Sequence, residues 1–150
     1  MILALDISTS ITGYSVVSRD GKIEASGFVD LRKKKSFVEK VSHAKNEIIM
    51  NCVGYDIEAV AVEKNLQAFR RGFSSAATID ALARMNGAVS YACASFYGVP
   101  LKNIDVNEAR KKMGIKILKE KVCGINKKEQ VKRALDDILE ASGQKMMWTT

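Results

Sequence analysis

The chain opens on an apolar run that ends in a charge, since Met1-Ile2-Leu3-Ala4-Leu5 is followed directly by Asp6. The run is typical of a buried strand, and a small-residue turn, Ser8-Thr9-Ser10, separates it from a second strand beginning near Thr12. A carboxylate at the end of a buried strand is costly to desolvate unless a cation or hydrogen-bond donors meet it. Two interpretations stay open: Asp6 binds a divalent metal through its oxygens, or it caps the turn by accepting backbone N–H groups.

A second carboxylate follows a second apolar run. The segment from Ile57 to Val62 is typical of a strand covered on both faces, and it ends in Glu63. If the two strands are parallel neighbours, both acids lie at the same end of the sheet, where open α/β sheets bind ligands. Asp6 and Glu63 could then hold one metal ion, whereas a second metal would need further carboxylates.

The order of the expected elements indicates an α/β fold with a mixed sheet. Asp20-Gly21 is a strong hairpin signal, and Ser36 and Glu39 have the spacing of a capping box. Gly98 and Pro100 stop a long helix whose small residues we interpret mainly as sheet packing. Strands are expected at 2–6, 12–18, 22–29, 57–63 and 101–105, and helices at 36–52, 74–97, 107–113 and from 126 onward.

Four patches of the sequence carry a resemblance to a known family. The stretch Leu3 to Tyr14, with its apolar strand, Asp, small residues and Thr-Gly, resembles the opening of the RuvC-type Holliday-junction resolvases, which are ribonuclease-H-like nucleases. The segment Ala61 to Lys64 is similar to the family's second acidic strand. Arg110 to Ile115 resembles the family's basic segment after the last core strand, and Gly124 to Val131 resembles the basic helix start that follows it.

The resemblance implies both a fold and an activity. The fold would be a ribonuclease-H-like α/β domain over residues 1–150, with a mixed five-stranded sheet of three antiparallel strands and then alternating helices and strands. The activity would be metal-dependent, structure-selective endonuclease cleavage of branched DNA such as four-way junctions. Asp6 and Glu63 would be the catalytic ligands of Mg²⁺, with Mn²⁺ as a substitute. The long helix contributes to a twofold dimer in the family, so a homodimer is expected.

The chain departs from the family's pattern near its C-terminal end. The family's last two acids lie on a C-terminal helix, at a distance that falls here at Trp148-Thr149-Thr150. Asp136 and Asp137 come too early and lie off the apolar stripe of their helix, so we interpret them as surface acids that pair with Lys132 or Arg133. We therefore expect that the sequence stops just before the family's final acidic motif.

The charge of the chain indicates a nucleic-acid partner. It has 24 Lys and Arg against 17 Asp and Glu, which gives a net charge of +7. The cluster Arg32 to Lys35 is interpreted as a solvated face, whereas the later clusters are expected to bind DNA phosphates. These expected DNA-binding residues are Arg110, Lys111, Lys112, Lys127 and Lys128, of which Lys128 best matches the family's basic site.

The loop that follows Glu63 is expected to overhang the two acids. It contains Phe69, Arg70 and Arg71, which combine an aromatic ring for unstacked bases with cations for phosphates. The alternative for Phe69 is a place in the core beneath the loop.

Two other function classes stay open. A DNA-binding module of the same fold that has lost cleavage would explain the missing acids. An actin-like ATPase or kinase shares the fold, but Ile7-Ser8 stands where its phosphate-touching glycine would be, and no later glycine-rich loop follows. Widely spaced Cys52, Cys93 and Cys123, with neither a signal peptide nor a membrane-spanning run, predict reduced thiols in a cytosolic setting and no membrane partner. The resemblance implies that this setting is a bacterial or phage-infected host cytoplasm.

Overall fold

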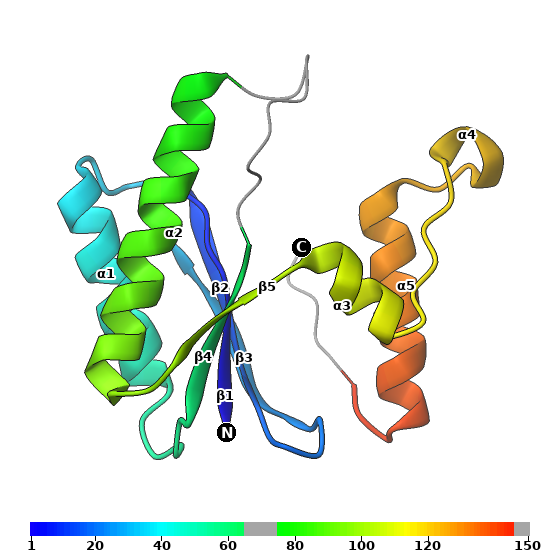
Figure 1. Ribbon diagram of the computed structural model, residues 1–150, viewed down its shortest axis with the longest axis horizontal. Helices are drawn as coiled ribbons and strands as arrows, with labels where there is room; N and C mark the ends of the chain where they lie inside the picture. Colours follow the sequence, from blue (N-terminus) through cyan, green and yellow to red (C-terminus); the bar gives the residue numbers. More distant parts are fainter. Residues whose placement is uncertain (65–74, 146–150) are drawn as a thin grey trace. The chain divides into compact units, whose positions relative to one another are not determined.

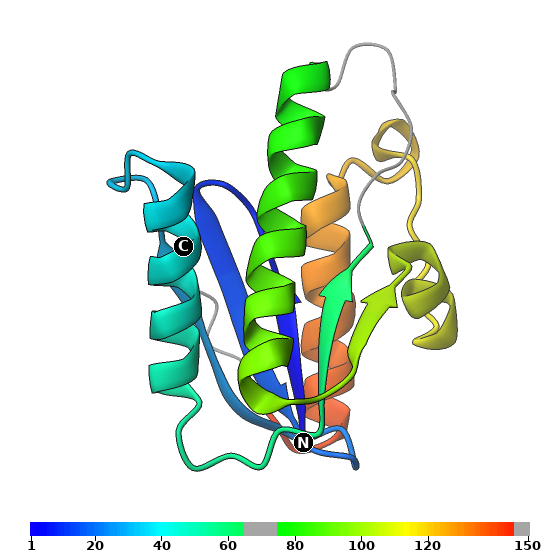
Figure 2. The ribbon, with the colours of Figure 1, turned by 60° about the vertical axis from the view of Figure 1, so that its left-hand side comes forward.

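Five strands form one sheet (Figure 1), in which the strand order is β3-β2-β1-β4-β5. The first three strands pair antiparallel, whereas β4 pairs parallel with β1, and β5 pairs parallel with β4 (Figure 2). This arrangement confirms the predicted fold class. The strands are β1 (Ile2–Asp6), β2 (Ile11–Val17), β3 (Ile23–Asp30), β4 (Ala59–Glu63) and β5 (Leu101–Ile104).

Two helices, α1 (Phe37–Asn51) and α2 (Ala76–Tyr97), lie side by side against one face of the sheet (Figure 1). The predicted capping box begins α1, because the Ser36 hydroxyl accepts the Glu39 amide while the Glu39 carboxylate accepts the Ser36 amide. Helix α2 ends at Gly98, whose φ of +64° is a left-handed conformation that glycine adopts without steric cost.

The core lies between this sheet face and the two helices. In β1 and β4 every second residue is buried, and Leu3, Leu5, Val60 and Val62 all face the helices. Met85, Val89 and Cys93 from α2 and Ala44 and Ile48 from α1 complete the layer. The interpretation of the small residues of α2 as sheet packing is wrong for those on the side of the helix that faces away from the sheet. The exposed small residues of α2 are Ala76, Ala77, Ala81, Ala83 and Gly87.

Tyr14 of β2 packs across the sheet onto Gly27 of β3. The two residues are register partners, and a Cβ at Gly27 would lie 2.5 Å from the Tyr14 hydroxyl oxygen. Only glycine leaves room for the ring, so this pair specifies the register of the outer hairpin.

Three helices follow the sheet: α3 (Val106–Lys112), α4 (Glu120–Cys123) and α5 (Lys127–Ala141). Asn126 caps α5 as predicted, by accepting the Glu129 amide at 2.9 Å. Helix α4 is too short to have a periodic signature, and the sequence did not predict it. The side chain of Gln130 ties α5 to the preceding segment, since its amide group donates to the carbonyls of Ile125 at 2.7 Å and Leu118 at 3.0 Å.

The computed structural model describes residues 1–64 and 75–145. The chain divides into two compact units, Met1–Asp105 and Val106–Thr150, and the expectation of one domain over residues 1–150 stays a prediction. Among the helices of the described residues, none has the length and apolar character needed to cross a lipid bilayer.

Candidate functional site

Asp6 and Glu63 are the last residues of two neighbouring parallel strands. The register pairs Leu5 of β1 with Val62 of β4, so one further step brings Asp6 opposite Glu63. The expectation that both acids lie at the same end of the sheet is therefore confirmed. Adjacent strands are about 4.8 Å apart, which brings the two carboxylates within reach of one ion.

Both carboxylates lie on the face of the sheet opposite to the helices α1 and α2. Leu5 and Val62 are buried on the helix side, and side chains alternate along a strand, so Asp6 and Glu63 extend the other way and are exposed. Beside Asp6 on β2 lies Gly13, where an added Cβ would be 3.7 Å from the Asp6 Cβ. The missing side chain at Gly13 leaves space for a ligand next to the carboxylate.

The turn after Asp6 is held together without the Asp6 carboxylate. The Ser8 hydroxyl accepts the amides of Ser10 at 3.2 Å and Ile11 at 3.0 Å, and the Lys40 ammonium donates to the Thr9 carbonyl at 2.7 Å. Within residues 1–64 and 75–145, no hydrogen bond or ion pair reaches the Asp6 carboxylate. The turn-capping interpretation of Asp6 is therefore not supported, because Ser8 has that role.

The end of β4 is attached to α2 through a buried amide. The Asn86 side chain donates to the Glu63 carbonyl at 3.1 Å, and only 7% of Asn86 is exposed. The sequence analysis missed this residue. Its signal was a large polar side chain on the helix face that also buries Met85, Val89 and Cys93, a position that needs a hydrogen-bond partner.

The carboxylate pair suits a hard divalent cation. Mg²⁺ prefers oxygen ligands and is commonly bound by one or two carboxylates, with water and substrate phosphate completing the octahedron. The described residues contain no group of three or more His, Cys, Asp and Glu side chains that could hold a metal. Asp6 and Glu63 thus fit one Mg²⁺ or Mn²⁺ with an incomplete protein ligand set.

Of the basic residues predicted to bind DNA, the five that lie beyond the loop after Glu63 are all in the C-terminal unit: Arg110, Lys111, Lys112, Lys127 and Lys128. Lys112 is paired with Glu108 one helical turn away, with an N–O distance of 2.9 Å, and Lys128 is exposed in the first turn of α5. Arg110, Lys111 and Lys127 line a common pocket. The structure therefore brings together three of these five side chains. In the sequence, α4 and its flanking connections separate Lys127 from Arg110 and Lys111.

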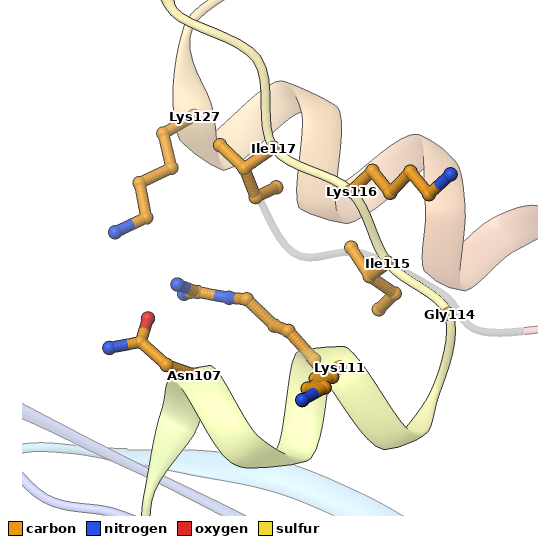
Figure 3. Close-up of a pocket in the computed structure, with 8 residues that line it drawn as sticks. Asn107, Lys111, Gly114, Ile115, Lys116, Ile117 and Lys127 are labelled. Carbon is orange, nitrogen blue, oxygen red and sulfur yellow. The ribbon is translucent and has the colours of Figure 1, made fainter.

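The pocket has a volume of about 420 Å³ and is lined by residues of α3, the connection after it and the start of α5. We call it the basic pocket. Besides Arg110, Lys111 and Lys127 it contains Lys116 and Asn107, which the sequence analysis did not select. The side chains of Asn107 and Lys127 end on the same side of the basic pocket, whereas Lys116 extends in the opposite direction (Figure 3).

Three predicted residues of the loop after Glu63, namely Phe69, Arg70 and Arg71, lie outside the described residues, as do Trp148 to Thr150. On α5, Asp137 is exposed and Asp136 half-buried, while Arg133 pairs with Glu129 at 2.9 Å. The pairing of the two aspartates with Lys132 or Arg133 stays a prediction.

Comparison with known proteins identifies the fold. No family model matches the chain, and no curated protein matches it. A Thermus thermophilus RuvC in complex with a Holliday junction substrate matches with a TM-score of 0.70 and 20% identity, over 99% of this chain and 82% of that one. A second Thermus thermophilus RuvC structure matches with a TM-score of 0.66 and 22% identity, over 99% of this chain and 84% of that one. The resemblance inferred from sequence is confirmed at the level of the fold.

Proposed function

We propose that this chain, which has the fold of RuvC, is a metal-dependent, structure-selective endonuclease for branched DNA such as four-way junctions. The observation that carries the proposal is the pair Asp6 and Glu63, at the ends of adjacent parallel strands and on one face of the sheet. Support comes from the structure of similar fold that holds a Holliday junction substrate.

The carboxylates of Asp6 and Glu63 would hold one Mg²⁺ or Mn²⁺. The ion, when bound, would polarise the scissile phosphate and activate an attacking water. The exposed position of the two side chains and the small Gly13 beside Asp6 leave room for a phosphodiester to approach. A second metal would require acids beyond those that residues 1–64 and 75–145 supply at this site.

The basic residues of the C-terminal unit would bind the DNA backbone. Phosphate contacts give affinity without sequence preference, so Arg110, Lys111, Lys112, Lys127 and Lys128 would position the DNA and leave the choice of substrate to its branched shape. Phe69, Arg70 and Arg71 would add contacts at the branch point, as the sequence predicts.

The protein would act as a homodimer formed through the outer side of α2. Ala81, Arg84 and Gly87 are exposed there, and Tyr91 is 70% exposed between them and the helix end. Small residues allow two helices to approach closely, and a large exposed aromatic ring is a common anchor of interfaces. A twofold dimer would match the symmetry of a four-way junction.

The proposal is tested by substituting the two acids without changing their size. The wild-type chain should cleave a four-way junction in Mg²⁺ or Mn²⁺ and not in EDTA. Asp6→Asn and Glu63→Gln should each lower the cleavage rate by more than about a hundredfold, because several kcal/mol of metal-derived stabilisation is lost. Junction binding in EDTA should be unchanged or tighter, since a negative charge near phosphate is removed.

Asp137→Asn is the matched control, because it removes an equally exposed acid that lies on α5. This variant should cleave at the wild-type rate. Near wild-type cleavage by Asp6→Asn or Glu63→Gln would rule out the assignment of the metal site.

A second candidate function is a DNA-binding module of the same fold that does not cleave. It is favoured by the lack of a third metal-binding side chain at the site among the described residues. Tight, metal-independent binding of four-way junctions by the wild-type chain, with no product in Mg²⁺ or Mn²⁺ over many hours, would establish this alternative.

A further inference from the structure

We propose that the basic pocket holds one backbone phosphate of the DNA together with its deoxyribose, and that it does so without reading the base. The inference deepens the proposed function, on which it rests for the identity of the polymer. It adds Asn107 to the residues expected to bind DNA. It also distinguishes Arg110 and Lys127, which line the basic pocket, from the cations of the C-terminal unit that lie outside it.

The charge of the basic pocket calls for an anion. Arg110, Lys111 and Lys127 contribute cations to its wall, Lys116 lines it with a side chain that extends in the opposite direction (Figure 3), and no acid is among its described lining residues. Like charges gathered in a concave surface repel one another and concentrate the positive potential there. The N-terminus of α5 adds to this potential, because Lys127 is the first residue of that helix. Lys112, by contrast, lies outside the basic pocket and is paired with Glu108.

The donors of the basic pocket suit a phosphate. Arg110 offers a planar fork that matches two phosphate oxygens, and Lys127 offers a point charge. The Asn107 amide and the Lys127 ammonium end on the same side of the basic pocket, so they can contact one group together (Figure 3). An amide donor beside two cations is a common way to orient a phosphodiester.

The remaining lining residues suit a sugar and not a base. Gly114, Ile115 and Ile117 provide an apolar wall, and the volume of about 420 Å³ exceeds what a phosphate group alone would fill. Base recognition in single strands commonly relies on stacking against aromatic rings. No aromatic side chain is among the described lining residues, so the basic pocket is expected to contact the backbone of any sequence.

The wall of the basic pocket is already organised by hydrogen bonds. The amides of Gly114 and Ile115 donate to the carbonyls of Lys111 at 3.1 Å and Arg110 at 2.9 Å, and Gly114 has a φ of +72°. Gln130 ties the Leu118 and Ile125 backbones to α5. Binding would therefore require little ordering of the chain, which favours affinity.

The test compares charge removal inside and outside the basic pocket in the full-length chain. Lys127→Gln and Arg110→Gln each remove one lining cation, and Lys121→Gln removes one exposed cation of α4 that is not a lining residue. Binding to a labelled four-way junction is measured in EDTA over a series of NaCl concentrations. Each pocket variant should flatten the slope of log K against log salt by about 0.9, the value for one phosphate contact, and Lys121→Gln should leave it unchanged.

A second measurement tests the indifference to bases. A single-stranded oligonucleotide and an abasic strand of the same length should lose affinity by the same factor on Lys127→Gln. Thermal unfolding of each variant confirms that it is folded, and Lys127 is exposed enough that its substitution leaves the helix intact.

Three results would overturn the inference: equal flattening by Lys121→Gln, a loss confined to strands with bases, or equally strong competition by an acidic peptide of the same charge. Because all of these measurements are made without metal, they are independent of cleavage. Pocket-dependent binding without cleavage would refute only the proposed function, whereas cleavage without pocket-dependent binding would refute only this inference.

Discussion

At the scale of single residues, Asn86 connects the helix α2 to the strand that carries Glu63. Its buried amide donates to the Glu63 carbonyl, so Asn86→Ala leaves that carbonyl without its side-chain donor and opens a small cavity. We expect the free energy of unfolding to fall by about 1–3 kcal/mol, measured by urea denaturation. We also expect weaker Mn²⁺ binding in calorimetry, because the end of β4 is no longer held in place.

The neighbouring residue provides the control for Asn86→Ala. Gly87 is exposed in the middle of α2, and an added Cβ would meet nothing within 4 Å. In a Tyr91→Glu background, which disrupts the proposed interface on α2, Gly87→Ala should therefore raise the free energy of unfolding by about 0.5–1 kcal/mol, with unchanged Mn²⁺ binding. A loss of stability in both variants would mean that α2 tolerates no change here, and it would contradict the specific role of Asn86.

The three cysteines should differ in reactivity. Burial raises the pKa of the Cys93 thiol to about 11 and also raises the pKa of Cys52, and both side chains are inaccessible. Cys123 is partly exposed. Because the thiolate is the reactive form, iodoacetamide at pH 8 should label Cys123 in the folded protein and all three cysteines in urea. Rapid labelling of Cys93 in the native state, detected by peptide mass spectrometry, would contradict the buried core described above.

At the scale of the elements, an ion pair links the β2–β3 turn to the start of β4. The Arg19 guanidinium donates to both carboxylate oxygens of Glu58, at 2.9 and 3.1 Å. These bonds, and a further one from the terminal ammonium of Met1, lower the pKa of Glu58 from its ordinary value of 4.5. The stabilisation that follows is present above pH 4.5 and is lost as the pH falls through the lower pKa of the folded state.

The expected effect is small, since ion pairs on the surface contribute little. Arg19→Gln should lower the melting temperature slightly at pH 7 in low salt, and the difference from wild type should shrink as the pH falls below 4.5. Lys121→Gln is the control, because it removes one exposed cation of α4. A difference between Arg19→Gln and wild type that grows on acidification would have the wrong sign for this ion pair.

At the scale of the whole molecule, the outer side of α2 predicts the oligomeric state. Tyr91→Glu places a charge in the proposed interface and should weaken dimerisation at least about tenfold, or 1.4 kcal/mol. Sedimentation equilibrium of the full-length chain measures this change. Met50→Glu changes an equally exposed apolar residue on α1 and should leave the dimer intact. A wild-type chain that stays monomeric while it cuts junctions would show that the homodimer is not needed.

Local signals in the sequence determined the elements of this fold. The turn at Asp20-Gly21, the capping box of Ser36 and Glu39, the Asn126 cap and the glycine after α2 all act within a few residues, so they could be recognised from the chain alone. The periodic apolar runs located β1 and β4 for the same reason, and each run ended in its acid. Helix α4 escaped prediction because four residues carry no period.

Contacts between distant residues were decided only by the tertiary structure. Asp6 and Glu63 are 57 positions apart in the sequence, and they share a face of the sheet only because β1 and β4 pair in parallel in this register. A register shift by one residue would turn one of them toward the helices. Likewise, the sequence selects Arg110, Lys111 and Lys127 as separate basic residues, and only the folding of the 113–126 connection places Lys127 in the same pocket as the other two. A sequence pattern specifies which face of an element is apolar, but the packing of elements decides which charged groups meet.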